Sequence, residues 1–222
     1  MKKILLSIIL FFLFSSISYA GPCLTTIASA STNQLACADD DILNVTSAGS
    51  ITYNDNKAVD LEDISGVQIT NDGTIQTEDG TNKQKAIHAE SSLNTTITNN
   101  GTINSDNNEG IILDYAENVI ITNNAGATIS AEGNNAISGR NVGNCHFNGA
   151  NCHSDLSGQS NGVGLTLHNH GTIASTHETI WLGSGSSGNH RSKGLKIYNY
   201  DGGIIKTTGE GDSPIKAFHV VD

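Results

Sequence analysis

The sequence predicts an all-β fold, a solenoid in which the chain winds into a helix of parallel strands. Two observations lead to this prediction. A short phrase with strand periodicity, clearest in residues 67–75, occurs six times, and the intervals between the copies contain a second apolar island, such as residues 86–87. A phrase repeated at intervals longer than a hairpin is the signature of a solenoid. The copies predict about six coils plus the start of a seventh.

The spacing of the copies sets the size of one coil. A Gly anchors the phrase at positions 49, 73, 101, 126, 171 and 202, and the smallest step between anchors is 24 residues. This length fits three short strands and three turns. The hexapeptide repeat of a left-handed β-helix, about 18 residues per coil, does not fit.

Within the phrase, apolar residues alternate with polar ones, so that the apolar residues of all coils point into one core. In residues 67–70, Val67 and Ile69 face one way and Gln68 and Thr70 the other. We therefore expect burial at Ile69, Ile97 and Leu167, and exposure at Gln68, Thr96 and Thr166.

An Asn and a Gly close each phrase and predict a tight corner between two strands. Gly adopts positive φ without steric cost, and Asn tolerates it better than most residues. Stacked coils would also place the Asn amides above one another, where they can hydrogen-bond as a ladder. The alternative interpretation, that Asn-Gly marks ordinary β-hairpins, is weaker. Hairpins would not repeat both the apolar island and the strand segment in every interval. The predicted corner residues are Asn71, Gly73, Asn99, Gly101, Asn123, Gly126, Asn169, Gly171, Asn199 and Gly202.

The N-terminal residues predict an exported protein. Lys2 and Lys3 precede an apolar run over residues 4–14, and small residues lead to Ala20. This pattern is typical of a secretory signal peptide over residues 1–20, cut after Ala20. Residues 21–42 are expected to form an N-terminal cap, in which a Cys23–Cys37 disulfide replaces the support of a coil beneath.

Residues 43–222 are assigned to the β-helix, with a loop insertion at residues 138–164. The insertion contains Cys145, His146, Cys152 and His153. A Cys145–Cys152 disulfide is the favoured interpretation, because exported cysteines are oxidised. A zinc site remains the alternative, since thiolate and imidazole are zinc ligands, although the spacing matches no usual zinc finger.

Composition restricts the partners of the protein. The formal net charge is −11, and such a surface repels nucleic acid and anionic lipid. After the signal peptide, no apolar run is long enough to span a membrane. We expect no cofactor and no resident metal.

The repeated phrase behind a bacterial signal peptide resembles the passenger domain of a Gram-negative autotransporter, over residues 43–221. The resemblance implies a right-handed parallel β-helix, exported by the Sec route and carried to the cell surface by a C-terminal β-barrel. The sequence departs from the family in one respect, because no barrel strands follow. A surface or secreted location is therefore an expectation, with the periplasm as the location if no barrel is ever attached.

The resemblance and the repeats favour a non-enzymatic surface or secreted passenger, with adhesion or structural display as its role. We predict ligand contact at Trp181, Tyr198 and Tyr200, together with the 138–164 and 183–193 loops, for an unknown carbohydrate or protein ligand. The alternative is a β-helical polysaccharide lyase or glycoside hydrolase. Asp114 and Glu117 are undistinguished catalytic candidates, and no acidic pair recurs on one face. The last coil, ending in the 215–221 segment, is predicted to offer an open strand edge for self-association.

Overall fold

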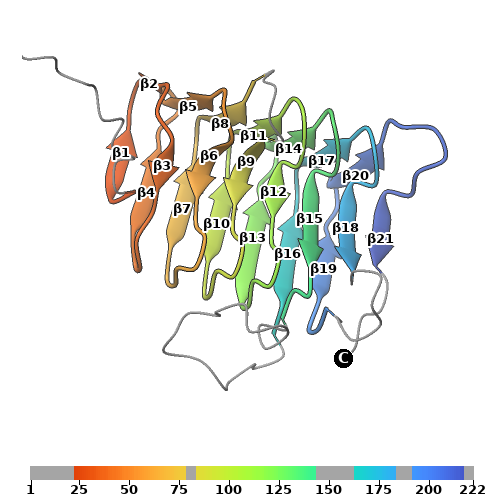
Figure 1. Cartoon of the computed structure of the whole chain (residues 1–222). Helices are drawn as coiled ribbons and strands as arrows, with labels where there is room; N and C mark the ends of the chain where they lie inside the picture. The colour runs from red at the N-terminus through yellow and green to blue at the C-terminus, as the bar shows by residue number, and fades with distance from the viewer. Residues whose placement is uncertain (1–22, 79–83, 144–162, 184–191, 218–222) are drawn as a thin grey trace, which may run out of the picture.

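The computed structural model describes residues 23–78, 84–143, 163–183 and 192–217. The predicted signal peptide and the Cys145–Cys152 segment lie outside these residues, as does most of the 183–193 loop. The described chain contains 21 strands and no helix, arranged as three parallel sheets of seven strands each. Consecutive strands belong to different sheets, and three strands make one coil (Figure 1). The predicted fold class, a right-handed parallel β-helix, is confirmed.

Each sheet takes every third strand of the chain. Sheet 1 contains β1 (Thr25–Ile27), β4 (Ile42–Val45), β7 (Gln68–Asn71), β10 (Thr96–Asn99), β13 (Val119–Asn123), β16 (Leu165–Asn169) and β19 (Lys196–Asn199). Sheet 2 contains β2 (Ala30–Ser31), β5 (Ser50–Tyr53), β8 (Thr74–Thr77), β11 (Thr102–Ser105), β14 (Thr128–Ala131), β17 (Thr172–Ser175) and β20 (Ile204–Thr207). Sheet 3 contains β3 (Leu35–Ala36), β6 (Lys57–Asp60), β9 (Lys85–His88), β12 (Ile111–Ile112), β15 (Ile137–Arg140), β18 (Ile180–Gly183) and β21 (Ile215–Ala217).

The core lies between the three sheets and is built from stacked aliphatic side chains. On sheet 1, Ile69, Ile97 and Leu167 are buried, as predicted from the alternation. Gln68 is exposed, and Thr96 and Thr166 are partly exposed on the outer face. Matching stacks from sheets 2 and 3 complete the core, with Ile75, Ile103, Ile129, Ile87, Ile111 and Ile137 among their members. A register shift of one residue would turn each stack outward.

The corner between sheets 1 and 2 contains a buried ladder of amides. The side chain of each Asn donates to the Oδ1 of the Asn in the next coil, over 2.7 to 2.9 Å. The ladder runs through Asn71, Asn99, Asn123, Asn169 and Asn199. Val45 stands beside Asn71 in the preceding coil, and Asn71 Oδ1 accepts no hydrogen bond from the described residues. The ladder therefore begins at Asn71.

The corner glycines are required by close packing of successive coils, and the expectation of positive φ was wrong for most of them. A Cβ on Gly73 would lie 2.1 Å from the carbonyl oxygen of Gly49, and one on Gly101 equally close to that of Gly73. Positive φ occurs at Gly126 and Gly202, where a Cβ would meet nothing within 4 Å. By the strand register, Ala127 occupies the position of Gly101, and Gly203 that of Gly171. Gly126 and Gly202 each lie one residue before that position.

The structure adds a coil within the segment that we expected to be a cap. β1, β2 and β3 pair in parallel with β4, β5 and β6, so the described chain has seven coils. The Cys23–Cys37 disulfide is formed and closes this first coil. The 138–164 insertion also begins later than predicted, because Ser138 and Arg140 belong to β15.

The last coil is the most exposed part of the solenoid. Ile204 and Ile215 are 47% and 43% exposed, whereas their equivalents in the preceding coil, Thr172 and Ile180, are half-buried and buried. β19, β20 and β21 are the last strands of the three sheets (Figure 1). In the described part of the chain, no helix is both long enough and apolar enough to cross a membrane.

Candidate ligand-binding face

The outer face of sheet 3 carries charged, polar, aliphatic and aromatic side chains in one row. Ile111, Ile137 and Ile180 point into the core, so the residue after each lies on the outer face of the sheet. These outward residues form one row across the coils, because the strands are in register. The row contains His88, Ile112, Ser138, Trp181 and Lys216.

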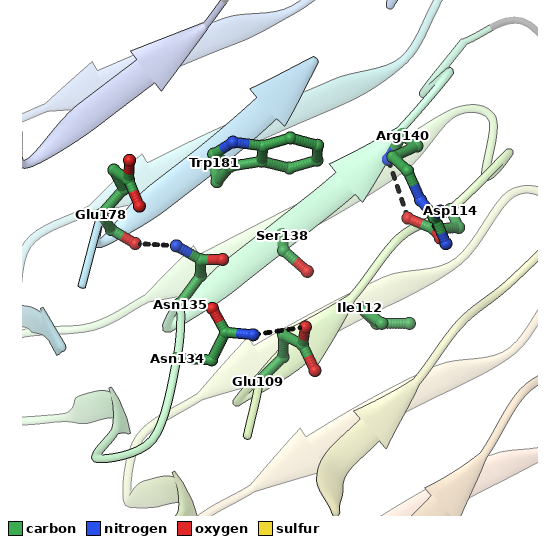
Figure 2. Close-up of a pocket in the computed structure, with 9 residues that line it drawn as sticks. All are labelled: Glu109, Ile112, Asp114, Asn134, Asn135, Ser138, Arg140, Glu178 and Trp181. Atoms are coloured by element: carbon green, nitrogen blue, oxygen red, sulfur yellow. Dashed lines mark hydrogen bonds and ion pairs between the residues drawn. The ribbon is translucent and has the colours of Figure 1, made fainter. Parts of the chain in front are cut away.

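A hollow of about 360 Å³ opens on this row, which we call the sheet 3 pocket. It lies where the small Ser138 separates the two larger side chains Ile112 and Trp181 (Figure 2). The lining residues come from three successive coils and are Glu109, Ile112, Asp114, Asn134, Asn135, Ser138, Arg140, Glu178 and Trp181. One apolar indole therefore faces a set of polar groups across a small space.

At one side of the sheet 3 pocket, Asp114 and Arg140 form a three-point contact. Asp114 Oδ1 accepts from the backbone N–H of Arg140 over 2.8 Å, and Oδ2 accepts from Nε and Nη2 over 2.8 and 2.5 Å. The Asp114 side chain is only 4% exposed, whereas Arg140 is 56% exposed. The hydrogen bond with Asp114 raises the pKa of Arg140 further. Such a contact fixes both side chains.

The opposite side is fixed by Glu178 and two asparagines. Lys216 Nζ donates to Glu178 Oε1 over 2.6 Å, and this hydrogen bond lowers the pKa of Glu178. Asn135 donates to the backbone carbonyl of Glu178, and Asn134 donates to Glu109 Oε1 over 2.9 Å. Glu178 is therefore an ionised hydrogen-bond acceptor at neutral pH.

A second cluster lies on the same sheet, around Lys57. Its ammonium lies 2.9 Å from Asp60 Oδ2, 2.8 Å from Glu62 Oε2 and 3.1 Å from His88 Nδ1. His88 Nδ1 also contacts Asp60 over 3.3 Å, and its Nε2 contacts Glu90 over 3.3 Å.

The atoms of Asp60, Glu62 and His88 that could hold a cation lie within 4.8 Å of one another. The Lys57 ammonium already contacts all three of these residues. A metal ion would have to displace this built-in cation. The geometry therefore supports an internal charge network in preference to a metal centre.

Titration of this network is governed by its contacts. Burial by itself would lower the pKa of His88, as would the nearby Lys57, but the hydrogen bonds with Asp60 and Glu90 outweigh both and raise it. The pKa of Glu90 is lowered, chiefly by its hydrogen bond with His88. Burial would raise the pKa of Asp60, but hydrogen bonds from His88 and Lys57 lower it.

The two tyrosines predicted to contact ligand lie on another face, on sheet 1. Tyr198 is in β19 and Tyr200 follows it, and they are 44% and 40% exposed. Each stacks on a histidine of the preceding coil: Tyr198 on His168 at 5.2 Å between ring centroids, and Tyr200 on His170 at 4.1 Å. His168 Nδ1 also hydrogen-bonds the Tyr200 hydroxyl over 2.8 Å.

The structure thus separates the three predicted contact residues, because Trp181 belongs to β18 of sheet 3. Of the two acidic residues considered from the sequence, Asp114 lines the sheet 3 pocket and Glu117 does not. Sequence reasoning missed Glu109, Ser138, Arg140 and the other polar lining residues. Aligning the apolar islands coil by coil would have placed Ile112, Ser138 and Trp181 in one row.

Comparison of the chain with models of protein families, with curated proteins and with solved structures finds no match.

Proposed function

We propose that this protein is a non-enzymatic, exported β-helical rod that acts at the cell surface or after secretion, in adhesion or structural display. The sheet 3 pocket supports this role, because its polar groups are held in place and suit binding. Its described carboxylates also have fixed partners: Asp114 is paired with Arg140, Glu178 with Lys216, and Glu109 accepts from Asn134.

The lowered pKa of Glu178 argues against this residue as the general acid of a glycoside hydrolase. Hydrolysis of a glycosidic bond uses a carboxyl group with a raised pKa as general acid, opposite a second carboxylate. The pKa of Glu178 is instead lowered by Lys216. A polysaccharide lyase or glycoside hydrolase is the alternative function, and the Asp114–Arg140 pair is the feature that favours it, since an Arg can stabilise an anionic intermediate.

The test of the proposed function has two arms. The full-length gene, including any sequence downstream, is expressed in its own bacterium, and exposure at the surface is measured by protease treatment of intact cells and by analysis of the medium. The purified chain from residue 21 is incubated with polysaccharides, and new reducing ends and unsaturated products are measured. Export without turnover is the expected result. Retention in the cytoplasm, or turnover abolished by Asp114→Asn, would overturn the proposal.

A further inference from the structure

The sheet 3 pocket has one apolar wall of distinctive shape. Trp181 is the only tryptophan of the sequence. It is partly exposed, and the residue beside it in register on β15 is the small Ser138. A flat aromatic ring next to such a gap offers its surface to a ring-shaped ligand with apolar C–H groups. Figure 2 shows the indole beside this space, with the polar residues around it.

The polar residues of the pocket are arranged to contact hydroxyl groups. Glu109, Asn134 and Asn135 lie on one side, and the Arg140 guanidinium lies on the other. Planar amides, carboxylates and guanidinium groups can accept from or donate to two neighbouring hydroxyls at once. Their mutual hydrogen bonds hold them before a ligand arrives, so that less side-chain entropy is lost on binding.

The charges around the pocket select against anionic ligands. Three carboxylates line it, from Glu109, Asp114 and Glu178. Two cations stand against them, because Arg140 is paired with Asp114 and Lys216 with Glu178. The chain as a whole also carries a net charge of −11. A uronate or sulfated sugar would therefore bring like charge to the site.

We propose that the sheet 3 pocket binds a neutral sugar residue of a glycan, with its ring stacked on Trp181 and its hydroxyls bonded to the surrounding amides and carboxylates. The proposal rests on the adhesive role proposed above and names its ligand class. Binding does not depend on the Tyr198 and Tyr200 stack, because that stack lies on sheet 1 and the pocket on sheet 3. The last coil contributes one support, Lys216, which holds Glu178.

The single tryptophan gives a direct readout of this site. The purified chain from residue 21 is titrated with neutral oligosaccharides of glucose, mannose, galactose and N-acetylglucosamine, and with oligogalacturonate as the anionic comparison. Trp181 emission and its quenching by acrylamide are recorded. We expect a saturable emission change and protection from quenching with at least one neutral series, and at least about tenfold weaker binding of oligogalacturonate. No response to any neutral series, or tighter binding of oligogalacturonate, would overturn the proposal.

Two variants locate the binding. Ser138→Leu fills the space beside the indole, and calorimetry should show a loss of affinity of at least about tenfold. Thr98→Leu, which also adds a large side chain but on the outer face of sheet 1, is the matched control and should bind as the unmodified chain does. Circular dichroism establishes that both variants fold. Equal affinity of Ser138→Leu and the unmodified chain would refute the site. A chain that is exported but binds no neutral sugar would refute this inference alone, whereas a chain that is not exported would refute the proposed function.

Discussion

Replacing Asn99 by Ala should destabilise the solenoid strongly, because Asn99 lies in the middle of the amide ladder. Its Oδ1 accepts from Asn71 over 2.8 Å, and its Nδ2 donates to Asn123 Oδ1 over 2.9 Å and to the Thr128 carbonyl over 3.0 Å. The side chain is fully buried. Each such hydrogen bond contributes about 1 kcal/mol net, so the three together contribute about 3 kcal/mol.

The matched control is Asn199→Ala, which makes the same chemical change at the exposed end of the same ladder. Asn199 accepts from Asn169 over 2.7 Å and donates to the Gly203 carbonyl over 2.8 Å. Water can replace these partners because the residue is exposed. The expected loss is therefore about 1 kcal/mol or less.

Urea unfolding followed by circular dichroism measures the difference. With an m-value of about 2 kcal/mol/M, Asn99→Ala should lower the midpoint by about 1.5 M, and Asn199→Ala by about 0.5 M or less. The comparison requires the same m-value in both variants, because a solenoid that unfolds in parts would change it. Equal shifts in the two variants would refute the assignment of stability to the buried ladder.

Three further predictions concern the charge networks and the first coil. Since the folded-state pKa of His88 is raised, its charged form stabilises the fold fully below about pH 6.5, and this contribution is lost as pH rises through the folded-state pKa. The difference in melting temperature between the unmodified chain and His88→Gln should therefore shrink as pH increases, and a constant difference would contradict the reasoning. Lys57→Met removes the ammonium from Asp60, Glu62 and His88, and calorimetry should then show Zn²⁺ binding at least about tenfold tighter than in the unmodified chain; a matched Lys85→Met variant should show no gain. Replacing both Cys23 and Cys37 by Ser opens a short loop and should cost about 3 kcal/mol in urea unfolding, whereas an unchanged midpoint would show that the first coil does not need the disulfide.

The coils that carry the Asn-x-Gly repeat could be predicted from the sequence. Strand alternation placed Ile69 and Ile97 in the core, and the stacking of Asn71 on Asn99 followed from a constant corner. The first coil was missed because it has neither mark of the repeat: Ile27 stands at the ladder position and Ser29 at the position of the corner glycine. The second coil has Val45 at the ladder position but keeps Gly49. The first coil pairs with the second through backbone hydrogen bonds, and such bonds do not require particular side chains that a sequence pattern could show.

The role of the corner glycines could not be read from one coil alone. Gly73 is required because the carbonyl of Gly49 in the preceding coil leaves no room for a Cβ, which is a contact between residues 24 positions apart. The sheet 3 pocket was missed for the same reason. It depends on Ser138 being small while Ile112 and Trp181, in the neighbouring coils, are large.

The uniform register of the coils makes a whole coil the natural unit by which such a chain can change in length. Thr96 and Ile120 occupy equivalent positions 24 residues apart, so removal of residues 96–119 would join Thr95 to Ile120 in the place that Thr96 held. Asn71 would then face Asn123, and the ladder would close over the deletion. Gain or loss of coils by recombination between repeats would therefore lengthen or shorten the rod while keeping the strand register. A change outside the three coils of the sheet 3 pocket would move this pocket nearer to or farther from whatever holds the end of the rod.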